Sequence, residues 1–154
     1  MKKVIFAASS GGHLSEIMNL SSLFKEYEYL LVTEKTDVTE QLNNTYNTEY
    51  LVYGPNKNRI EYVINIFKNI FLCIKILINF KPETIVSTGA QVGGMMCFLG
   101  KLFRCKVIYI ESLAKTRSLS KTGKNVYKFA DKFYVQWESL AAMYEKAEYL
   151  GRMM

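Results

Sequence analysis

The sequence has 154 residues, of which 49% are hydrophobic and 22% are charged. This length corresponds to about one domain, and the composition is that of a globular protein, which excludes the disordered, collagen-like and coiled-coil classes. The single histidine and the three cysteines show no metal-ligand spacing and no disulfide framework. We therefore expect residues 1–154 to form a single domain of a reducing compartment, with no metal and no cofactor.

Positive charge is concentrated in the middle of the chain. The net charge is +6, but residues 57–132 alone contain 14 Lys or Arg against 4 Asp or Glu, while the rest of the chain has a balance of −4. This polarity favours an anionic partner, such as a phosphorylated substrate, an acidic membrane or a nucleic acid. A basic surface that is simply solvated is the alternative reading.

The N-terminal sequence M-K-K-V-I-F-A-A-S-S-G-G-H has an apolar run that stops at Ala8. This run is too short for a signal peptide and is typical of a first β-strand. No uncharged stretch reaches 18 residues, so we expect no plain transmembrane helix.

Strand-like and helix-like runs alternate along the chain. Short apolar runs predict strands at residues 3–8, 29–33, 49–53, 84–88, 106–110 and 132–136. Helical spacing of apolar residues predicts helices at 14–24, 60–80, 92–103, 126–130 and 138–150, with a weak helix at 37–45 and a turn at 54–56. The alternation predicts an α/β fold with a Rossmann-like parallel sheet flanked by helices. Ligands bind such sheets at the carboxyl ends of the strands.

The first strand is followed by Ser9-Ser10-Gly11-Gly12-His13. Glycines let the backbone approach a ligand closely, and the next helix would offer free N–H groups to an anion. The segment matches neither a dinucleotide-binding nor a Walker motif, and a tight strand-to-helix turn is the simpler explanation. His13 sharpens the case for function, because it lies where this fold binds ligands and histidine titrates near neutral pH.

Two further strand ends carry candidate residues. Gly89, Ala90 and Gln91 begin a second glycine-rich junction that could cradle a phosphate or a sugar, although Gly93 and Gly94 equally fit close packing on the sheet. Glu111 follows the fifth strand, where a carboxylate could bind sugar hydroxyls, act as a base, cap a helix or pair with a lysine. Glu34 has the spacing of a ribose-binding acid, which we take as coincidence without a third glycine.

The predicted helix at residues 60–80 has an unusually wide apolar surface. At 100° per residue its polar side chains fall in an arc of about 120°, whereas packing on a sheet requires an apolar stripe of only about 100°. The excess apolar surface requires a membrane or a partner protein, or else a position between the sheet and another helix. We expect membrane contact through Ile66, Phe67, Ile70 and Ile74, with Lys68 and Lys75 near anionic lipid head groups.

The stretch Y-I-E-S-L-A-K-T-R-S-L-S-K-T-G-K-N-V-Y-K-F-A-D-K-F-Y-V-Q-W, residues 109–137, together with S-G-G-H-L-S-E near the N-terminus, closely resembles the asparagine-linked glycosylation protein fourteen family. That family includes bacterial capsule and exopolysaccharide proteins. The resemblance implies the N-terminal half of a split GT-B glycosyltransferase, which anchors at the membrane and recruits a second chain that binds the nucleotide-sugar. Together the two chains extend a polyprenol-diphosphate-linked sugar. GT-B enzymes generally need no bound metal.

The resemblance also implies roles for single residues. Gly11, Gly12 and His13 would form the acceptor-side loop, and Glu111 and Ser112 would lie on the floor of the cleft. Ser120 and Gly123 belong to the matched late motif without an assigned role. We expect His13 and Glu111 to be catalytic, and we expect the following residues to bind the acceptor: Ser10, Gly11, Gly12, Gly89, Gln91, Ser112, Arg117 and Ser118.

The eukaryotic member of the family has an N-terminal membrane anchor that this sequence lacks, so the resemblance suggests a bacterial form on the cytoplasmic face of the plasma membrane, attached through residues 60–80. Two other functions compete. A nucleotide-cofactor oxidoreductase is disfavoured by the missing third glycine. A nucleic-acid-binding domain is disfavoured because the basic residues accompany serines and an amphipathic helix, without the aromatic motifs of common RNA-binding folds.

Overall fold

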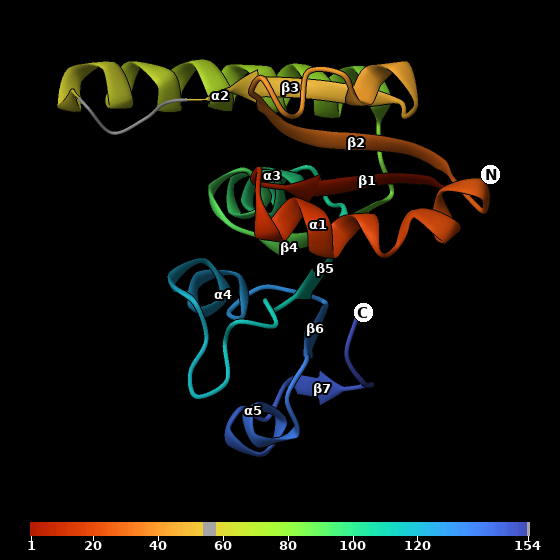
Figure 1. Cartoon of the computed structure of the whole chain (residues 1–154), viewed down its shortest axis with the longest axis vertical. Coiled ribbons are helices and arrows are strands. Elements are labelled where there is room, and N and C mark those ends of the chain that lie inside the picture. The colour runs from red at the N-terminus through yellow and green to blue at the C-terminus, as the bar shows by residue number, and fades with distance from the viewer. Residues whose placement is uncertain (54–57, 154) are drawn as a thin grey trace.

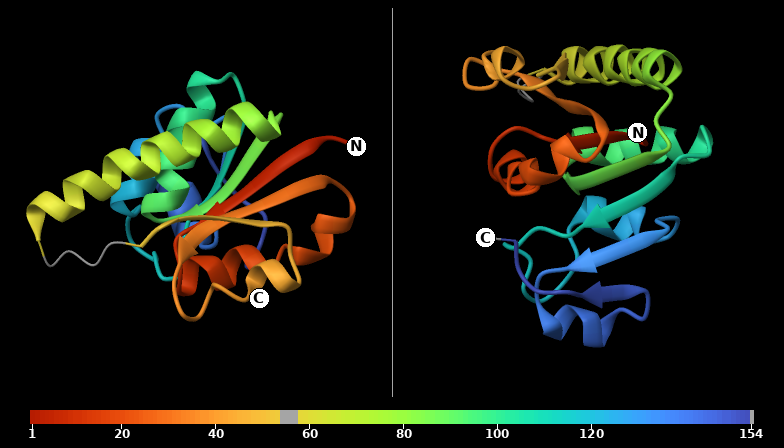
Figure 2. Two further views of the ribbon diagram at one scale, coloured as in Figure 1. Left: turned by 90° about the horizontal axis from the view of Figure 1, so that it is seen from above. Right: turned by 90° about the vertical axis from the view of Figure 1, so that its right-hand side faces the viewer.

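The computed structural model describes residues 1–53 and 58–153. Seven parallel strands form one sheet in the order β3-β2-β1-β4-β5-β6-β7 (Figures 1 and 2). The strands are β1 (Lys3–Ala8), β2 (Glu28–Lys35), β3 (Thr48–Val52), β4 (Thr84–Gly89), β5 (Lys106–Ile110), β6 (Lys132–Val135) and β7 (Ala147–Tyr149). The expected Rossmann-like parallel sheet flanked by helices is confirmed.

Helices cover both faces of this sheet. One face carries α2 (Arg59–Phe80), α3 (Gln91–Leu102), α4 (Lys121–Val126) and α5 (Glu138–Met143), which close a large apolar core over β1 to β7. The other face carries α1 (Gly12–Met18) and the 3₁₀ turn η1 (Ser21–Lys25), which close a smaller core over β1 and β2. Inward-facing residues alternate along the strands, so Ile5 and Ala7 enter the large core while Val4 and Phe6 enter the small one.

All three cysteines lie in the interior. Cys73, Cys97 and Cys105 are buried and free, with Cys73 on α2 and Cys97 on α3. Burial raises the pKa of the Cys73 thiol and of the Cys97 thiol to about 12, and it also raises the pKa of Cys105. The thiols therefore act as small apolar side chains of the core.

Some expected elements differ from the structure. The polar run 37–45 forms turns and a single 3₁₀ turn, η2 (Leu42–Asn44), and the run 14–24 is divided into α1 and η1. The fourth helix precedes residues 126–130, because Ser120 caps it by accepting a hydrogen bond from the Gly123 N–H at 2.8 Å. The turn expected at 54–56 lies outside the described residues.

The C-terminal segment also differs from the expected helix at 138–150. Helix α5 ends at Met143, and residues 147–149 add a seventh strand beside β6. The edge of β6 offers backbone hydrogen-bonding groups to this segment. The side chain of Ala147 is buried in the large core, which determines the face of β7 that points inward. Pairing within the whole sheet thus overrides a weak local helical pattern.

The sheet order determines where a ligand can approach. From β1 the chain proceeds outward to β2 and β3 and then returns to place β4 on the other side of β1. Loops therefore diverge between the carboxyl ends of β1 and β4, which is the usual ligand position in open parallel sheets. Both glycine-rich junctions of the sequence lie at this point.

Candidate functional site at the carboxyl edge of the sheet

The two glycine-rich loops are bonded to each other at the sheet edge. The Ser9 N–H donates to the Gly89 carbonyl at 2.8 Å, and the Val92 N–H donates to the Ser9 hydroxyl at 3.1 Å. Ser9 thus holds the loop after β1 against the start of α3. Gly11 and Gly12 remain exposed beside this junction, as expected of residues that line an open site.

His13 is fixed by its δ nitrogen. Nδ1 lies 2.7 Å from the Thr88 carbonyl oxygen, and the Thr88 hydroxyl donates to the His13 carbonyl, also at 2.7 Å. A carbonyl can only accept, so Nδ1 carries the proton and the neutral ring leaves Nε2 as an acceptor. The side chain is 27% exposed, which lets Nε2 meet a ligand.

Gly89 leaves room for this imidazole. Its φ of +101° is a conformation that residues with a side chain rarely adopt. A Cβ at this position would lie 2.9 Å from the Tyr109 hydroxyl and 3.3 Å from two atoms of the His13 ring. Close packing against the His13 ring therefore requires a glycine at this position. Gly89 itself has no side chain that could contact a ligand.

Glu16 connects His13 to the basic loop and was missed in the sequence. It accepts hydrogen bonds from the Ser112 hydroxyl at 3.0 Å and the Leu113 N–H at 2.8 Å through Oε1. Its Oε2 atom lies 4.0 Å from His13 Nδ1 and is buried without a hydrogen-bond partner among the described residues. The available signal was spacing, because residues three apart share a helix face.

Glu111 lies at the end of β5, beneath the loop that follows this strand. It is fully buried, and its two oxygens accept bonds from the Ser112 N–H (3.0 Å), the Ser120 N–H (2.9 Å) and the Ser120 hydroxyl (3.2 Å). A Cβ on Gly123 would lie only 2.0 Å from this carboxylate. These hydrogen bonds hold the residues that follow β5 in place above the carboxylate, and a catalytic role for Glu111 stays a prediction.

Tyr109 lies beneath these groups. Burial, together with the neighbouring Glu111 charge, raises the pKa of its phenol, so the ring stays neutral. Its hydroxyl is buried and has no hydrogen-bond partner among the described residues. The residue therefore supports the floor between Gly89 and Glu111.

The loop that Glu111 organises presents basic side chains. Lys115, Arg117 and Ser118 are exposed, whereas Ser112 is buried and bonded to Glu16. Gln91 is exposed on the other side of the edge, and Ser10 donates its N–H to the Glu34 carboxylate. Glu34 thus holds the first glycine loop, and acceptor binding by these residues stays a prediction.

Helix α2 has an exposed apolar face, but it is not the one expected. Ile70 and Ile74 are half-buried and pack on the core, and Ile66 is also half-buried. The amide of Asn69 turns toward β3, which places this side of the helix against the sheet. Phe67, Lys68 and Lys75 are exposed as expected. The outer α2 face is formed by Ile60, Val63, Ile64, Phe67, Phe71 and Ile78, each between 47% and 71% exposed.

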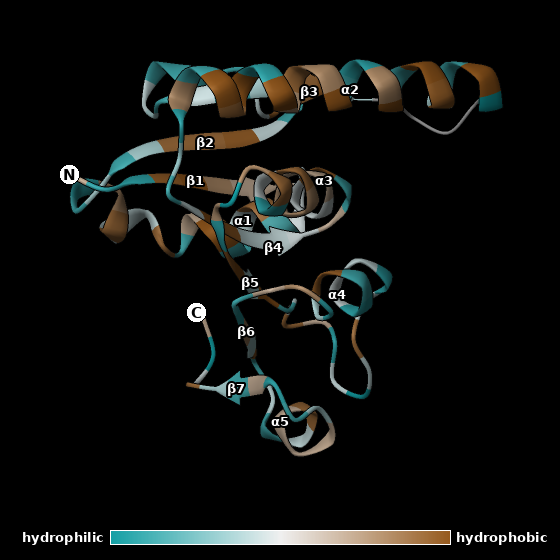
Figure 3. Cartoon of the chain, turned by 180° about the vertical axis from the view of Figure 1, so that it is seen from behind, coloured by the Kyte–Doolittle hydropathy of each residue, from teal (hydrophilic) through white to brown (hydrophobic). Residues whose placement is uncertain are grey.

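Figure 3 shows α2 along one end of the molecule with predominantly hydrophobic turns. By length and composition alone, α2 is long and apolar enough to cross a membrane. Its buried residues Cys73, Ile76 and Leu77 pack on the sheet, so in this fold it is a surface helix with one apolar side outward.

Comparisons with known proteins agree with the fold and the motifs. Residues 56–153 match the family model described as "Oligosaccharide biosynthesis protein Alg14 like". The UDP-N-acetylglucosamine transferase subunit ALG14 of Yarrowia lipolytica is 30% identical over 97% of this chain and 80% of its own length. The protein of the same name from Mus musculus is 28% identical over 99% of this chain and 83% of its own.

Solved structures share the fold at low identity. The chain superposes on Acinetobacter baumannii MurG with a TM-score of 0.75 and 15% identity, covering 90% of this chain and 43% of that one. It superposes on the UDP-N-acetylglucosamine 2-epimerase of Rickettsia bellii with a TM-score of 0.74 and 16% identity, covering 100% and 46%. The chain thus spans less than half of each of these proteins.

The family match covers well over half of the residues and includes the basic loop held by Glu111, and the relatives align over nearly the whole chain. The expected resemblance is confirmed: the chain belongs to the family of Alg14-like oligosaccharide biosynthesis proteins.

Proposed function

We propose that this chain is the acceptor-binding, membrane-associating subunit of a two-chain GT-B glycosyltransferase. It binds a polyprenol-diphosphate-linked sugar and recruits a partner chain that holds the nucleotide-sugar. The names of its relatives suggest UDP-N-acetylglucosamine as the donor. The product would enter a lipid-linked oligosaccharide or a capsule-type polysaccharide.

The observation that carries this proposal is the fixed orientation of His13. With Nδ1 bound to the Thr88 carbonyl and the side chain 27% exposed, Nε2 is left as the atom that would take the proton from an acceptor hydroxyl as it attacks the donor sugar. The rest of the reaction requires a second wall that binds the nucleotide. This requirement fits a chain that spans less than half of MurG and of the epimerase.

Basic groups support an acceptor that carries phosphate. Lys115 and Arg117 are exposed on the loop that Glu111 and Glu16 hold beside His13. Charged side chains on a loop of fixed path can hold a diphosphate while the sugar hydroxyl meets the histidine. Acceptor binding by Arg117 and Ser118 is part of this proposal.

Membrane association is supported by the outer α2 face. Six apolar side chains are exposed on it, and Phe98 and Leu102 of α3 are also more than half exposed. Lys68 and Lys75 lie on the same helix, where they can meet anionic head groups. The proposed location is the cytoplasmic face of a membrane. The relatives named above are fungal and mammalian, so they do not support the bacterial origin expected from the sequence.

An oxidoreductase that binds a nucleotide cofactor is less well supported. The ribose of such a cofactor would require a free carboxylate at the end of β2. Glu34 occupies that place and keeps one carboxylate oxygen open, but the first glycine loop, Ser9-Ser10-Gly11-Gly12-His13, lacks the third glycine of a dinucleotide-binding motif.

Reconstitution of the two chains tests the proposal. The purified chain is incubated with UDP-N-acetylglucosamine and a short-chain polyprenol diphosphate N-acetylglucosamine, with and without the partner chain that carries the nucleotide-binding domain. We expect transfer only when both chains are present. Sugar transfer by this chain alone contradicts the proposal. So does a complex of both chains that transfers no sugar to any lipid-linked acceptor offered.

A further inference from the structure

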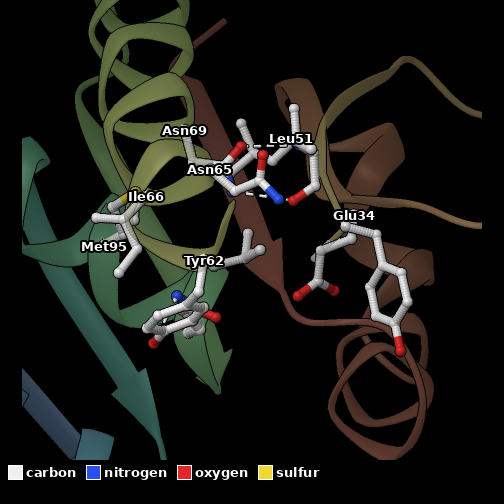
Figure 4. A pocket seen from close by; sticks show the side chains of 11 residues that line it. Glu34, Leu51, Tyr62, Asn65, Ile66, Asn69 and Met95 are labelled. Carbon is white, nitrogen blue, oxygen red and sulfur yellow. Dashed lines mark hydrogen bonds between the residues drawn. The ribbon is translucent and has the colours of Figure 1, made fainter. Parts of the chain in front are cut away.

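A cavity beside the first glycine loop has no assigned role. Its volume is about 240 Å³, and it lies between the carboxyl ends of β2 and β3, the first half of α2 and the start of α3 (Figure 4). Glu34 and Gln91 line it, and these residues belong to the two loops of the candidate site. The cavity therefore borders the first glycine loop through the bond between Glu34 and Ser10.

The chemistry of the lining points to a neutral ligand with many hydroxyl groups. Its polar lining residues carry phenol, amide and carboxylate groups: Tyr53, Tyr62, Asn65, Gln91 and Glu34. No Lys or Arg is among the described lining residues, and a carboxylate would repel a phosphate. Tyrosine rings pack on the apolar face of a sugar ring, while carboxylates and amides bind its hydroxyls.

Glu34 is the group best placed to bind such hydroxyls. It is 9% exposed, and its carboxylate projects into the cavity opposite Tyr62 (Figure 4). One oxygen accepts the Ser10 N–H, and the other has no hydrogen-bond partner among the described residues. Tyr62 is held in turn by the Gln91 amide, which donates to its hydroxyl at 3.4 Å.

We propose that this cavity binds the pyranose ring of the lipid-linked acceptor, with Glu34 and Tyr62 as its specificity-determining residues. This inference rests on the proposed function. Its geometric support is that α2 lines the cavity with Tyr62, Asn65 and Ile66 while the same turns expose Val63, Ile64 and Phe67. A lipid held at the outer α2 face would thus have its sugar on the inner side of that helix, beside the Glu34 carboxylate.

Variants that keep the fold test the cavity in the two-chain enzyme. Glu34→Gln retains an oxygen for the Ser10 N–H but loses the negative charge, and Tyr62→Phe removes one hydroxyl. We expect each to raise the KM for the acceptor about tenfold, with kcat little changed, because the ring is bound equally in the ground and transition states. Glu49→Gln, which changes an exposed carboxylate at the opposite end of β3, is the matched control.

A binding experiment separates this inference from the proposed function. The isotope-labelled chain alone is titrated with free N-acetylglucosamine, for which a dissociation constant in the millimolar range is expected of so small a ligand. Amide shifts at Glu34, Tyr62 and Asn65 that are lost in Glu34→Gln support the cavity even if no partner yields transferase activity. An unchanged KM in both variants of an active complex, or no shifts at these residues, overturns it.

Discussion

His13 and Thr88 hold each other through two hydrogen bonds of 2.7 Å, one from each residue to the carbonyl of the other. The two residues are 75 positions apart in the sequence, with His13 in the first turn of α1 and Thr88 near the end of β4. This reciprocal pair fixes both the backbone of the first glycine loop and the tautomer of the imidazole. A base that is oriented before the substrate arrives requires no reorganisation during the reaction.

Removal of the histidine should therefore affect chemistry and leave the fold intact. His13→Asn keeps an amide N–H for the Thr88 carbonyl but has no atom that can take a proton. We expect turnover of the two-chain complex at saturating acceptor to fall by about 10²–10⁴-fold, the usual effect of losing a general base. Complex formation, measured by co-purification, should be unchanged, and near-full turnover would place the base on the partner chain.

Replacement of Glu111 should instead destabilise the chain. Glu111→Ala leaves the Ser112 and Ser120 N–H groups without their acceptor, and each unsatisfied buried group costs about 1–3 kcal/mol. We expect the isolated chain to lose about 2–4 kcal/mol in chemical denaturation. Glu40→Ala, at an exposed position, is the control and should change stability by less than about 0.5 kcal/mol.

Gly123 should be intolerant of a methyl group for the same reason. A Cβ there would lie 2.0 Å from the Glu111 carboxylate, which three hydrogen bonds hold in place. We expect Gly123→Ala to lower the free energy of unfolding by about 1–3 kcal/mol, as overpacking does. Both variants are compared by thermal unfolding. A Cβ at Gly12 meets no atom within 4 Å, so Gly12→Ala should be nearly neutral. Equal losses of stability in the two variants would contradict the close contact at Gly123.

Membrane attachment can be separated from folding, because the outer α2 face makes little contact with the core. Phe67 and Phe71 are 68% and 69% exposed, and burial of each ring in a bilayer interface should contribute about 1.5–3 kcal/mol. We expect the double variant Phe67→Glu, Phe71→Glu to lose binding to anionic vesicles in flotation by about 100-fold or more.

A matched control for this variant is Val38→Glu with Met143→Glu, at positions 88% and 62% exposed but outside α2. This pair adds the same charge and should float as the unmodified chain does. If the unmodified chain fails to bind anionic vesicles, or if both double variants lose binding equally, the outer α2 face is not the attachment surface.

The buried thiols give a pH dependence with a defined sign. Burial raises the pKa of Cys73 and of Cys97 from 9.0 to about 12, so an unfolded thiol ionises before a folded one. Their contribution to stability is complete below pH 9 and should be lost as the pH rises toward 12. We also expect no reaction with a thiol reagent at neutral pH in the native chain and three reactive thiols in denaturant; native reactivity would contradict this burial.

The sequence was sufficient for the alternation of strands and helices, because core strands such as β1 and β5 are continuous apolar runs with the same bounds in the structure. The sequence was insufficient where polar side chains form hydrogen bonds inside the fold. Asn65 and Asn69 mark a solvent-facing arc on a helical projection, yet both turn toward β3. Contacts made by Glu16 and Glu111 with loops distant along the chain also have no local signature.

The site was predictable to the extent that the fold gathers strand ends. His13 and the glycine loops lie where a parallel sheet binds ligands, but Glu111 follows its strand too and is sealed below the loop. Position after a strand therefore predicts that a residue lies near the site. Its burial and hydrogen bonds are needed to distinguish an accessible base from a residue that holds a loop.

The side chain of Asn69 acts toward β3 as a short piece of neighbouring strand. Its amide oxygen accepts the Val52 N–H at 2.8 Å, and its amide nitrogen donates to the Val52 carbonyl at 3.0 Å. An outer strand with unsatisfied backbone groups invites edge-to-edge pairing, and Asn69 closes β3 at its carboxyl end, while the opposite border strand, β7, has only three residues. A further strand that paired with the end of β3 would consequently have to displace the Asn69 amide from the Val52 backbone.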